Sequence, residues 1–289
     1  MIGKNGQVGW ELQHTLPPLG RVIALDRTQM DLTRPDAIRK AIRDLSPDII
    51  VNAAGYTTVD KAEQEPELAM QVNAIAPGII AEEARRMDAL FVHYSTDYVF
   101  DGTQSAPYVE EDVPNPLNTY GKTKLAGERA IIATQCKHLR LRASWIYSTR
   151  GTNFVLTMLK LARERKELSV VSDQIGSPTS AADLAKATAD LISKYNGAAE
   201  HTGVFHMSAA GYASRFEFAK EITETARRLS GAPCGWAAIR ETTTENYPLP
   251  AARPLNAATS KEKIKKVFDV KLGEWRHQLR AHLEQGRLQ

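Results

Sequence analysis

The chain has 289 residues, of which 43% are hydrophobic and 25% charged, with a net charge of +3. This balance is ordinary for a globular protein and excludes collagen-like, low-complexity and wholly disordered chains. Such mild basicity does not indicate nucleic acid or an anionic membrane as a partner. No apolar run reaches the roughly 18 residues that span a bilayer, and the N-terminus lacks the apolar core of a signal peptide. Cys136 and Cys234 have no metal-ligand spacing, so we expect reduced thiols in a cytoplasmic protein.

Short β-branched runs alternate with helical patterns in the first half of the chain. Strands are expected at 21–26, 48–55, 90–100 and 139–147, with helices between them at 36–45, 61–87 and 122–134. The strands are continuous apolar runs, which indicates that helices cover both faces of the sheet. The alternation predicts an α/β fold, a Rossmann-like doubly wound parallel sheet.

After residue 147 this rhythm changes. Helices are expected at 153–166, 181–195, 215–230 and 272–284, short strands at 168–172 and 204–208, and mostly loop over 231–256, which contains Pro233, Pro248, Pro250 and Pro254. We predict a dinucleotide-binding domain over 1–149, to which 168–208 partly returns. The smaller C-terminal substrate lobe comprises 150–167 and 209–289, and a cleft separates the two parts.

A glycine-rich loop opens the chain. Gly3, Gly6 and Gly9 precede a helical pattern, and glycines let the backbone approach a pyrophosphate at the positive end of such a helix. Asp26 follows Gly9 by 17 residues, near the spacing at which an acid meets the adenosine ribose. Arg27 could pair with a 2′-phosphate, which favours NADPH and leaves NADH possible.

The glycine fingerprint lacks most of its leading strand. Only Met1 and Ile2 precede Gly3, where a strand of about 5–6 residues is expected. In this fold that strand is central. We therefore expect either a truncated start or a gap in the sheet beside the cofactor site, with lower stability than an intact version.

A tyrosine and a lysine, Tyr120 and Lys124, lie four positions apart and share a helix face. A tyrosine holds a donatable proton at neutral pH, and a nearby ammonium stabilises the phenolate that remains. The pair therefore predicts a general acid with an electrostatic assistant. Thr96 ends an apolar strand, where α/β sheets place functional groups, and could donate a hydrogen bond to a substrate carbonyl.

Several motifs together resemble the dTDP-4-dehydrorhamnose reductase family of the extended short-chain dehydrogenase/reductase superfamily, over essentially the whole chain. The motifs are Gly3-Lys-Asn-Gly-Gln-Val-Gly9, Val51-Asn-Ala-Ala-Gly-Tyr-Thr57, Ser95-Thr-Asp-Tyr-Val-Phe-Asp-Gly102, Tyr120-Gly-Lys-Thr-Lys-Leu-Ala-Gly-Glu128, Arg142-Ala-Ser-Trp-Ile-Tyr147 and Arg253-Pro-Leu-Asn256. The resemblance implies hydride transfer from NADPH, or NADH, to C4 of a dTDP-4-keto-6-deoxy sugar. It also implies Tyr120 as proton donor, Lys124 on the nicotinamide ribose and Thr96 on the carbonyl.

The same resemblance implies the binding residues. For the cofactor they are Gly3, Gly6, Gln7, Val8, Asp26, Asp31, Leu32, Gly55, Tyr56, Thr57, Tyr94, Tyr120 and Lys124. For the sugar nucleotide they are Thr96, Asp97, Tyr98, Trp145 and Arg253. Trp145 could instead be core and Arg253 merely solvated, while Asp60 and Glu63 have the spacing of a helix capping box.

The resemblance leaves metal and assembly open. Some members are described as magnesium-linked dimers, and Glu11 matches one such position, but no glutamate follows where the pattern needs one near Asp183. We therefore predict no metal site, leave magnesium undecided, and expect a monomer or a homodimer.

Two other functions compete with reduction. A nucleotide-sugar dehydratase follows its threonine with Asp-Glu, whereas Asp97-Tyr98 stands here; an epimerase is also less favoured. A non-catalytic NADP-binding regulatory subunit is the alternative from a different class, against which the intact Tyr120 and Lys124 argue.

Overall fold

The computed structural model describes residues 1–231 and 235–285, so Pro233 and Cys234 lie outside the described residues. Its centre is a sheet in the order β1-β2-β3-β8, made of Ile49–Asn52, Leu90–Thr96, His138–Ala143 and Gly203–His206. All three pairings are parallel, and every residue of β2 and β3 is buried. The parallel sheet predicted from apolar runs is confirmed.

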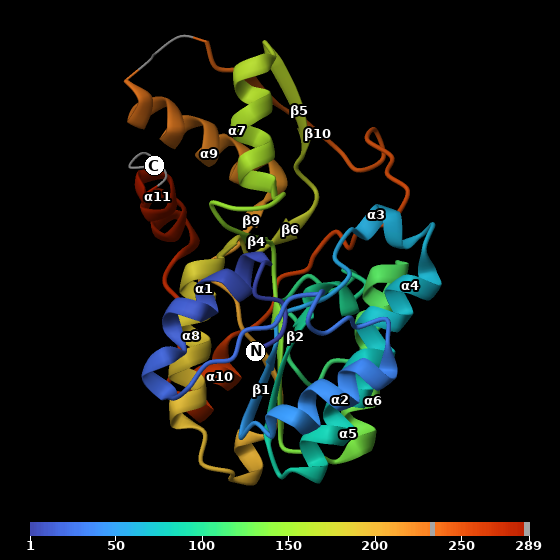
Figure 1. The fold of residues 1–289 in the computed structure, drawn as a ribbon. Coiled ribbons are helices and arrows are strands. Elements are labelled where there is room, and N and C mark those ends of the chain that lie inside the picture. The colour runs from blue at the N-terminus through green and yellow to red at the C-terminus, as the bar shows by residue number, and fades with distance from the viewer. Residues whose placement is uncertain (232–234, 286–289) are drawn as a thin grey trace.

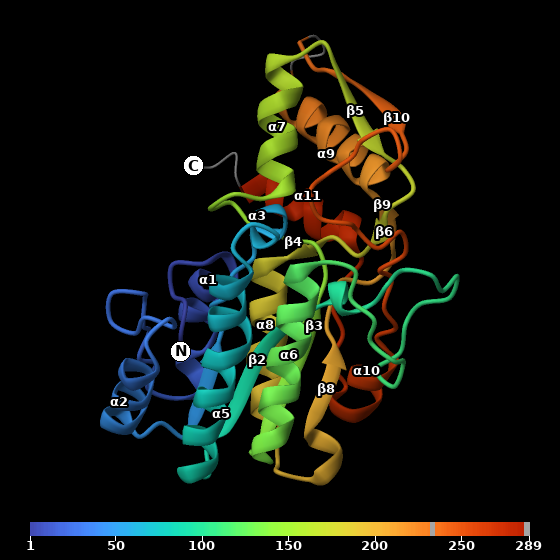
Figure 2. The ribbon, with the colours of Figure 1, turned by 90° about the vertical axis from the view of Figure 1, so that its right-hand side faces the viewer.

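Helices cover both faces of this sheet (Figures 1 and 2). On one face α2 (Pro35–Leu45) packs against α5 (Ala76–Arg86), and α5 against α6 (Thr119–Thr134). On the other face α1 (Gln7–Thr15) packs against α8 (Ala181–Lys194). Figure 2 shows α5 and α6 in front of the strands and α8 behind them. The result is the three-layer arrangement of a doubly wound fold.

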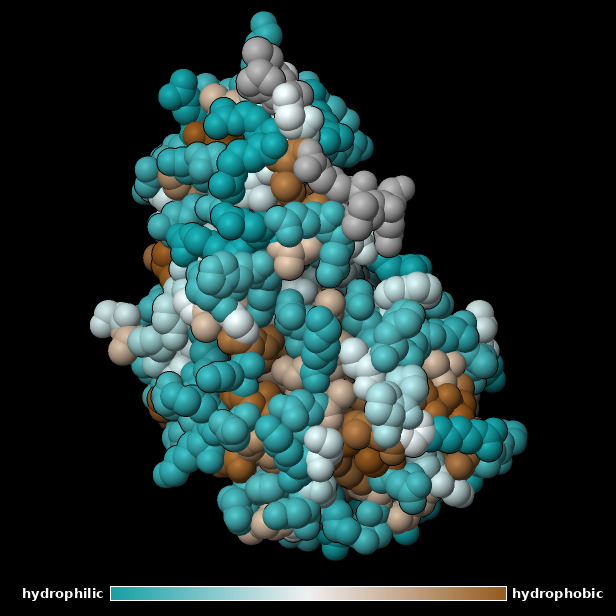
Figure 3. All heavy atoms as spheres, turned by 90° about the vertical axis from the view of Figure 1, so that its left-hand side faces the viewer, coloured by the Kyte–Doolittle hydropathy of each residue, from teal (hydrophilic) through white to brown (hydrophobic). Residues whose placement is uncertain are grey.

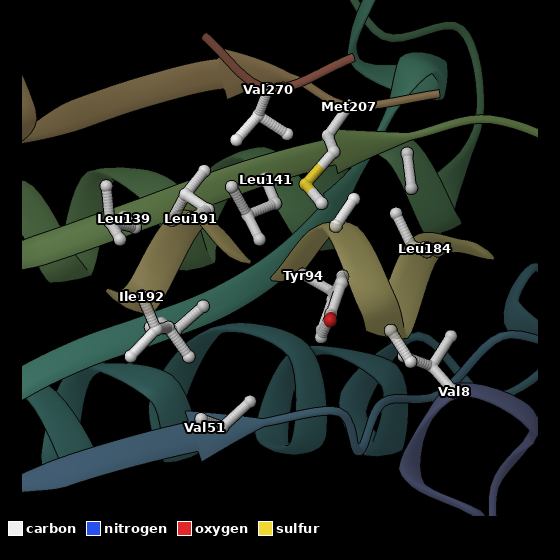
Figure 4. Close-up of a cluster of buried hydrophobic side chains, with 14 of the residues drawn as sticks. Val8, Val51, Tyr94, Leu139, Leu141, Leu184, Leu191, Ile192, Met207 and Val270 are labelled. Atoms are coloured by element: carbon white, nitrogen blue, oxygen red, sulfur yellow. The ribbon is translucent and has the colours of Figure 1, made fainter. Parts of the chain in front are cut away.

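Buried aliphatic side chains from the sheet and α8 form one core (Figure 4). In this view Leu139 and Leu141 of β3 lie among Leu184, Leu191 and Ile192 of α8. These positions of α8 repeat at helical spacing, so one stripe of the helix faces the strands. The core thereby fixes the strand ends on which the candidate site is built.

The leading strand is reduced to a single bridging residue. Ile2 bridges in parallel to both Leu25 and Asn52, donating to the Val51 carbonyl at 2.8 Å and accepting from the Ala53 amide at 3.0 Å. The strand expected over 21–26 is likewise only the bridge at Leu25. Beyond β1 the sheet therefore continues as single-residue bridges, with Ile2 between Asn52 and Leu25.

The helix expected over 61–87 is divided. It comprises α3 (Val59–Ala62), α4 (Pro66–Met70), the π-helical η2 (Gln71–Ile75) and α5. Pro66 begins α4 because proline lacks the amide that a continuing helix would need. The strand expected over 90–100 also stops early, because β2 ends at Thr96 and the 3₁₀ turn η3 (Asp97–Val99) follows.

A smaller lobe stands on the sheet part (Figure 1). It contains α7 (Phe154–Glu164), α9 (Arg215–Ser230), α11 (Trp275–Gln285) and a parallel pair of β5 (Glu167–Val171) with β10 (Ala238–Thr242). Apart from the five residues of β10, the described part of 231–256 is mostly loop and turn, as expected. Short pairs join the two parts: β4 (Ile146–Tyr147) with β7 (Thr179–Ser180), and β6 (Ile175–Gly176) with β9 (Ala213–Ser214).

The remaining elements are short. The 3₁₀ turns η1 and η4 span Pro17–Leu19 and Ala199–His201. α10 (Glu262–Phe268) had no counterpart in the sequence analysis and packs against β8, so this late segment returns to the sheet part. The face in Figure 3 is mainly hydrophilic, with separate brown patches in its lower half. Within the described residues, no helix is long and apolar enough to cross a membrane.

Candidate active site

A cavity of about 770 Å³ opens at the carboxyl ends of β1 and β2, with lining from both the sheet part and the smaller lobe. Its lining contains every residue that the sequence analysis named as catalytic, cofactor-binding or substrate-binding, except Arg253. These are Gly3, Gly6, Gln7, Val8, Asp26, Asp31, Leu32, Gly55, Tyr56, Thr57, Tyr94, Thr96, Asp97, Tyr98, Tyr120, Lys124 and Trp145. Residues spread over more than a hundred positions thus meet at the edge where parallel sheets bind ligands.

The glycine loop has no room for side chains. Gly3 has φ +89°, and a Cβ there would lie 2.7 Å from the Ala54 amide nitrogen. A Cβ at Gly9 would collide with the Gly3 carbonyl. Gly6 caps α1 without a side-chain hydrogen bond, so the first amides of this nine-residue helix stay available. This arrangement fits a pyrophosphate at the helix N-terminus.

Asp26 lies at the rim beside two donors. The Thr28 hydroxyl donates to its carboxylate at 2.6 Å, and the Lys4 ammonium lies 3.1 Å away. These hydrogen bonds, first from Thr28 and then from Lys4, hold the pKa of Asp26 well below its usual range. The carboxylate is therefore ionised and can accept from ribose hydroxyls, and Arg27, the cation named for a 2′-phosphate, lines the same cavity.

Tyr120 and Lys124 project from the first turns of α6 into the cavity. Asn118 starts this helix by accepting the Gly121 amide at 2.8 Å. The Lys124 ammonium donates to the Tyr94 carbonyl at 2.5 Å and lies 3.3 Å from His93 Nε2. Burial lowers the pKa of Lys124 to about 8, so the side chain is a cation at neutral pH that lacks a carboxylate partner among the described residues.

The acidity of Tyr120 differs from the sequence-based expectation. Burial raises its pKa above the ordinary value, the Thr96 side chain opposes this by hydrogen bonding, and Asp97 adds to the rise. Lys124 points its ammonium at β2, as its two contacts show, and does not lower the pKa of Tyr120 here. The phenol therefore keeps its proton at neutral pH, which is the state that a proton donor needs.

Thr96 and Asp97 form a polar pair where β2 ends. The Thr96 hydroxyl donates to Asp97 Oδ1 at 3.0 Å, and the Ser144 hydroxyl donates to Oδ2 at 2.6 Å. Burial raises the pKa of Asp97 to about 6, although these hydroxyls oppose the change. The Thr96 oxygen also accepts the Tyr98 amide at 3.2 Å, which fixes the hydroxyl beside Tyr120.

Two of the residues expected beside the nicotinamide, Tyr94 and Tyr56, make hydrogen bonds in the site through their backbone groups. The Tyr94 hydroxyl turns into the core and bonds Thr188 at 2.5 Å, among the side chains drawn in Figure 4, so its carbonyl is what Lys124 uses. Asn73 holds the Tyr56 backbone on both sides, at 2.8 and 2.9 Å. Asn73 was missed by the sequence analysis because it lies inside a helical run with no local polar pattern.

Trp145 lines the cavity, so it is not merely core. Its φ is +43°, a left-handed conformation that is rare for a bulky residue and typical of functional sites. The Arg215 guanidinium lies 3.6 Å from the centre of the indole ring and lines the same cavity. Arg215 was not among the predicted residues.

Arg253 and Asp60 form a partly buried bidentate pair. The two guanidinium nitrogens of Arg253 reach the Asp60 oxygens at 2.6 and 2.7 Å. The capping box expected for Asp60 and Glu63 is therefore wrong, because α3 has no side-chain cap and Glu63 instead accepts from Thr119 at 2.7 and 2.8 Å. Arg253 does not line the cavity.

The described part of the chain contains no group of three or more His, Cys, Asp or Glu side chains that could hold a metal ion. Cys136 is a buried free thiol. The chemistry available in the cavity is thus that of a phenol, an ammonium, a threonine hydroxyl and a glycine cradle.

Known proteins resemble the chain over its full length. The family model described as "RmlD substrate binding domain" matches residues 1–288. A dTDP-4-dehydrorhamnose reductase of Burkholderia thailandensis is 44% identical over 282 residues, covering 96% of this chain and 95% of the relative. The crystal structure of a dTDP-4-dehydrorhamnose reductase from Clostridium acetobutylicum superposes with a TM-score of 0.90 at 36% identity, covering 99% and 98% of the two chains. That of the Bacillus anthracis reductase in complex with NADP gives 0.90 at 34% identity, covering 98% and 97%.

Proposed function

Since the chain belongs to the family of the RmlD substrate binding domain, whose relatives include dTDP-4-dehydrorhamnose reductases, we propose that it is an NADPH-dependent reductase of dTDP-4-dehydro-L-rhamnose. The reaction converts the C4 ketone to an alcohol and yields dTDP-L-rhamnose. NADPH, when bound, supplies the hydride that adds to C4. NADH stays possible as a second donor.

The chain's own residues supply the proton and the orientation. Tyr120 gives its phenolic proton to the C4 oxygen as negative charge develops there. The Thr96 hydroxyl, which donates to Asp97 Oδ1 in the structure, turns to donate a hydrogen bond to the same oxygen. The Lys124 ammonium, held by the Tyr94 carbonyl of β2, binds the nicotinamide ribose. Gly3, Gly6 and the first amides of α1 hold the pyrophosphate, and Asp26 holds the adenosine ribose.

One observation carries this proposal: Thr96, Tyr120 and Lys124 line the same cavity as the glycine cradle. A core role for the three side chains would leave them packed among apolar groups. Here the Tyr120 proton, the Thr96 hydroxyl and an ammonium without a carboxylate converge where a nicotinamide and a ketone would meet.

The test is an assay of NADPH oxidation by the whole chain. Purified protein is mixed with NADPH and dTDP-4-dehydro-L-rhamnose, and the absorbance of the reduced cofactor is followed against a buffer control. Decay that depends on both substrates supports the proposal. Tight NADPH binding without decay would instead assign the chain to non-catalytic NADP-binding subunits. Decay with dTDP-4-keto sugars of other configuration but not with this one would reassign its substrate.

The proposal includes a cytoplasmic monomer or homodimer. The buried free thiol of Cys136 agrees with a reducing compartment. Size-exclusion chromatography with light scattering, with and without magnesium, decides between the two assembly states.

A further inference from the structure

Arg215 places a cation in the substrate half of the cavity. It is the first residue of α9, and the centre of its guanidinium lies 3.6 Å from the Trp145 ring centroid and 5.0 Å from that of Phe154. Stacking on two aromatic rings fixes the guanidinium plane without using its N–H donors. One of those donors bonds the Tyr98 side chain, and the others are available to a ligand in the cavity.

No carboxylate neutralises this cation. Within residues 1–231 and 235–285, Arg215 has no ion pair, whereas Arg253 nearby is neutralised by both oxygens of Asp60. Asp97 attracts the guanidinium, but its two oxygens accept from the Thr96 and Ser144 hydroxyls and form no ion pair with Arg215. A partly buried cation without an ion pair is costly to the folded state, so the cavity favours a ligand that brings negative charge.

The position of Arg215 relative to Tyr120 identifies the charged part of that ligand. The Tyr98 side chain interacts with Arg215, and the Tyr98 ring meets the Tyr120 ring edge-on with centroids 5.9 Å apart. A sugar whose ketone reaches Tyr120 therefore extends past Tyr98 toward the guanidinium. The group that follows the sugar in a nucleotide sugar is a diphosphate, and planar guanidinium groups bind phosphate oxygens in pairs.

We propose that Arg215, stacked on Trp145, binds the diphosphate of the nucleotide-sugar substrate. This assignment rests on the proposed function for the identity of the ligand. It also gives Trp145 a second task, because the indole holds the guanidinium in place.

The test compares dTDP with thymidine, which lacks the phosphates, by calorimetry on the protein saturated with NADP⁺. The variants are Arg215→Gln and Arg215→Lys. Arg150→Gln is the matched control, because Arg150 lies 3.5 Å over the Trp10 ring in the same kind of stack and does not line the cavity. Arg215→Gln should weaken dTDP binding by about 10- to 100-fold, in line with the strength of a charged hydrogen bond.

The ratio of dTDP affinity to thymidine affinity is the deciding quantity, since a general distortion of the cavity lowers both. Arg215→Lys keeps the charge but not the paired donors and should fall between the wild type and Arg215→Gln. Arg150→Gln should keep the wild-type ratio. An unchanged ratio in Arg215→Gln overturns the assignment, even if the wild type reduces its substrate. A wild type that fails to oxidise NADPH, by contrast, overturns the proposed reaction and leaves the dTDP measurement to judge Arg215 alone.

Discussion

One face of helix α6 contains two buried charged groups, of which one is paired with opposite charges and the other is not. Near its N-terminus, Tyr120 and Lys124 face the cavity, and the Lys124 ammonium contacts only a carbonyl and an imidazole. One turn later the buried Glu128 carboxylate accepts from Arg142 at 2.8 and 2.9 Å, from Arg140 at 3.3 Å and from the Ser95 hydroxyl at 2.5 Å.

The contrast separates groups that hold the fold from groups that await a ligand. Burial would raise the pKa of Glu128, but Arg142 outweighs this and lowers it, so the charge of Glu128 is neutralised without substrate. Lys124 stays charged without a carboxylate of its own. A residue's burial alone therefore does not tell its role, whereas the presence or absence of a charge partner does.

The largest effect is expected from Tyr120→Phe, which removes the proton donor and nothing else. Turnover should fall by about 10²- to 10⁴-fold, the usual contribution of a general acid, while the NADPH dissociation constant stays nearly unchanged. Steady-state kinetics and fluorescence titration measure the two quantities. Wild-type turnover in this variant would show that Tyr120 is not the proton donor.

Glu128→Gln tests the other region of the same face. Loss of the carboxylate leaves Arg142 and Arg140 buried without a partner, and the free energy of unfolding should fall by about 3–5 kcal/mol. Glu82→Gln is the control, because Glu82 forms an exposed pair with Arg39 and should lose at most about 1 kcal/mol. Urea denaturation measures both. Similar losses of unfolding free energy in the two variants would contradict the structural role of the buried Glu128 network.

Lys124→Met replaces the unpaired ammonium by an apolar chain of similar length. Both the NADPH affinity and the turnover should fall. The affinity should fall by about 10-fold, which corresponds to the free energy of one hydrogen bond to a charged group. Lys122→Met on the exposed side of the same helix is the control and should leave both unchanged. Wild-type values for both quantities in Lys124→Met would exclude its proposed role.

The smallest effect is a pH dependence of cofactor binding. Burial lowers the pKa of Lys124 to about 8, against the raising effect of Glu128, so the ammonium is present below that pH and is lost above it. NADPH affinity should therefore be constant from pH 7 and decline above pH 8, by less than 10-fold per unit. Lys124→Met should show no such decline. A wild-type profile that stays flat to pH 9.5 would mean that Lys124 keeps its proton.

The sequence predicted elements best where local interactions decide them. α9 was expected over 215–230 and has those limits, because Ser214 and Glu217 form a reciprocal capping box at its start. The buried strands were predicted because their apolar runs are long and continuous. β10 is partly exposed and has no long, continuous apolar run. It forms by pairing with β5, far earlier in the chain.

The residues that line the cavity were predictable where a single sequence motif contains them. The glycine loop and the Tyr120–Lys124 pair each lie within a single turn or helix, and the resemblance extended them to the rest of the lining. Charge partners escaped prediction because they are set by tertiary contacts. Asp60 looked like a local cap, yet it pairs with Arg253, 193 positions away, and Arg215 reaches the cavity only because α9 begins beside Trp145.

The absence of a side chain on β6 decides where the indole of Trp145 rests. A Cβ at Gly176 would collide with the ring atoms Cε2, Cζ2 and Nε1 of that indole, and residue 176 does not itself line the cavity. Even a single methyl group at position 176 would have to displace the ring, together with the guanidinium stacked on it. A change behind the surface of the cavity would thus reshape it and leave the identity of every lining residue as it is.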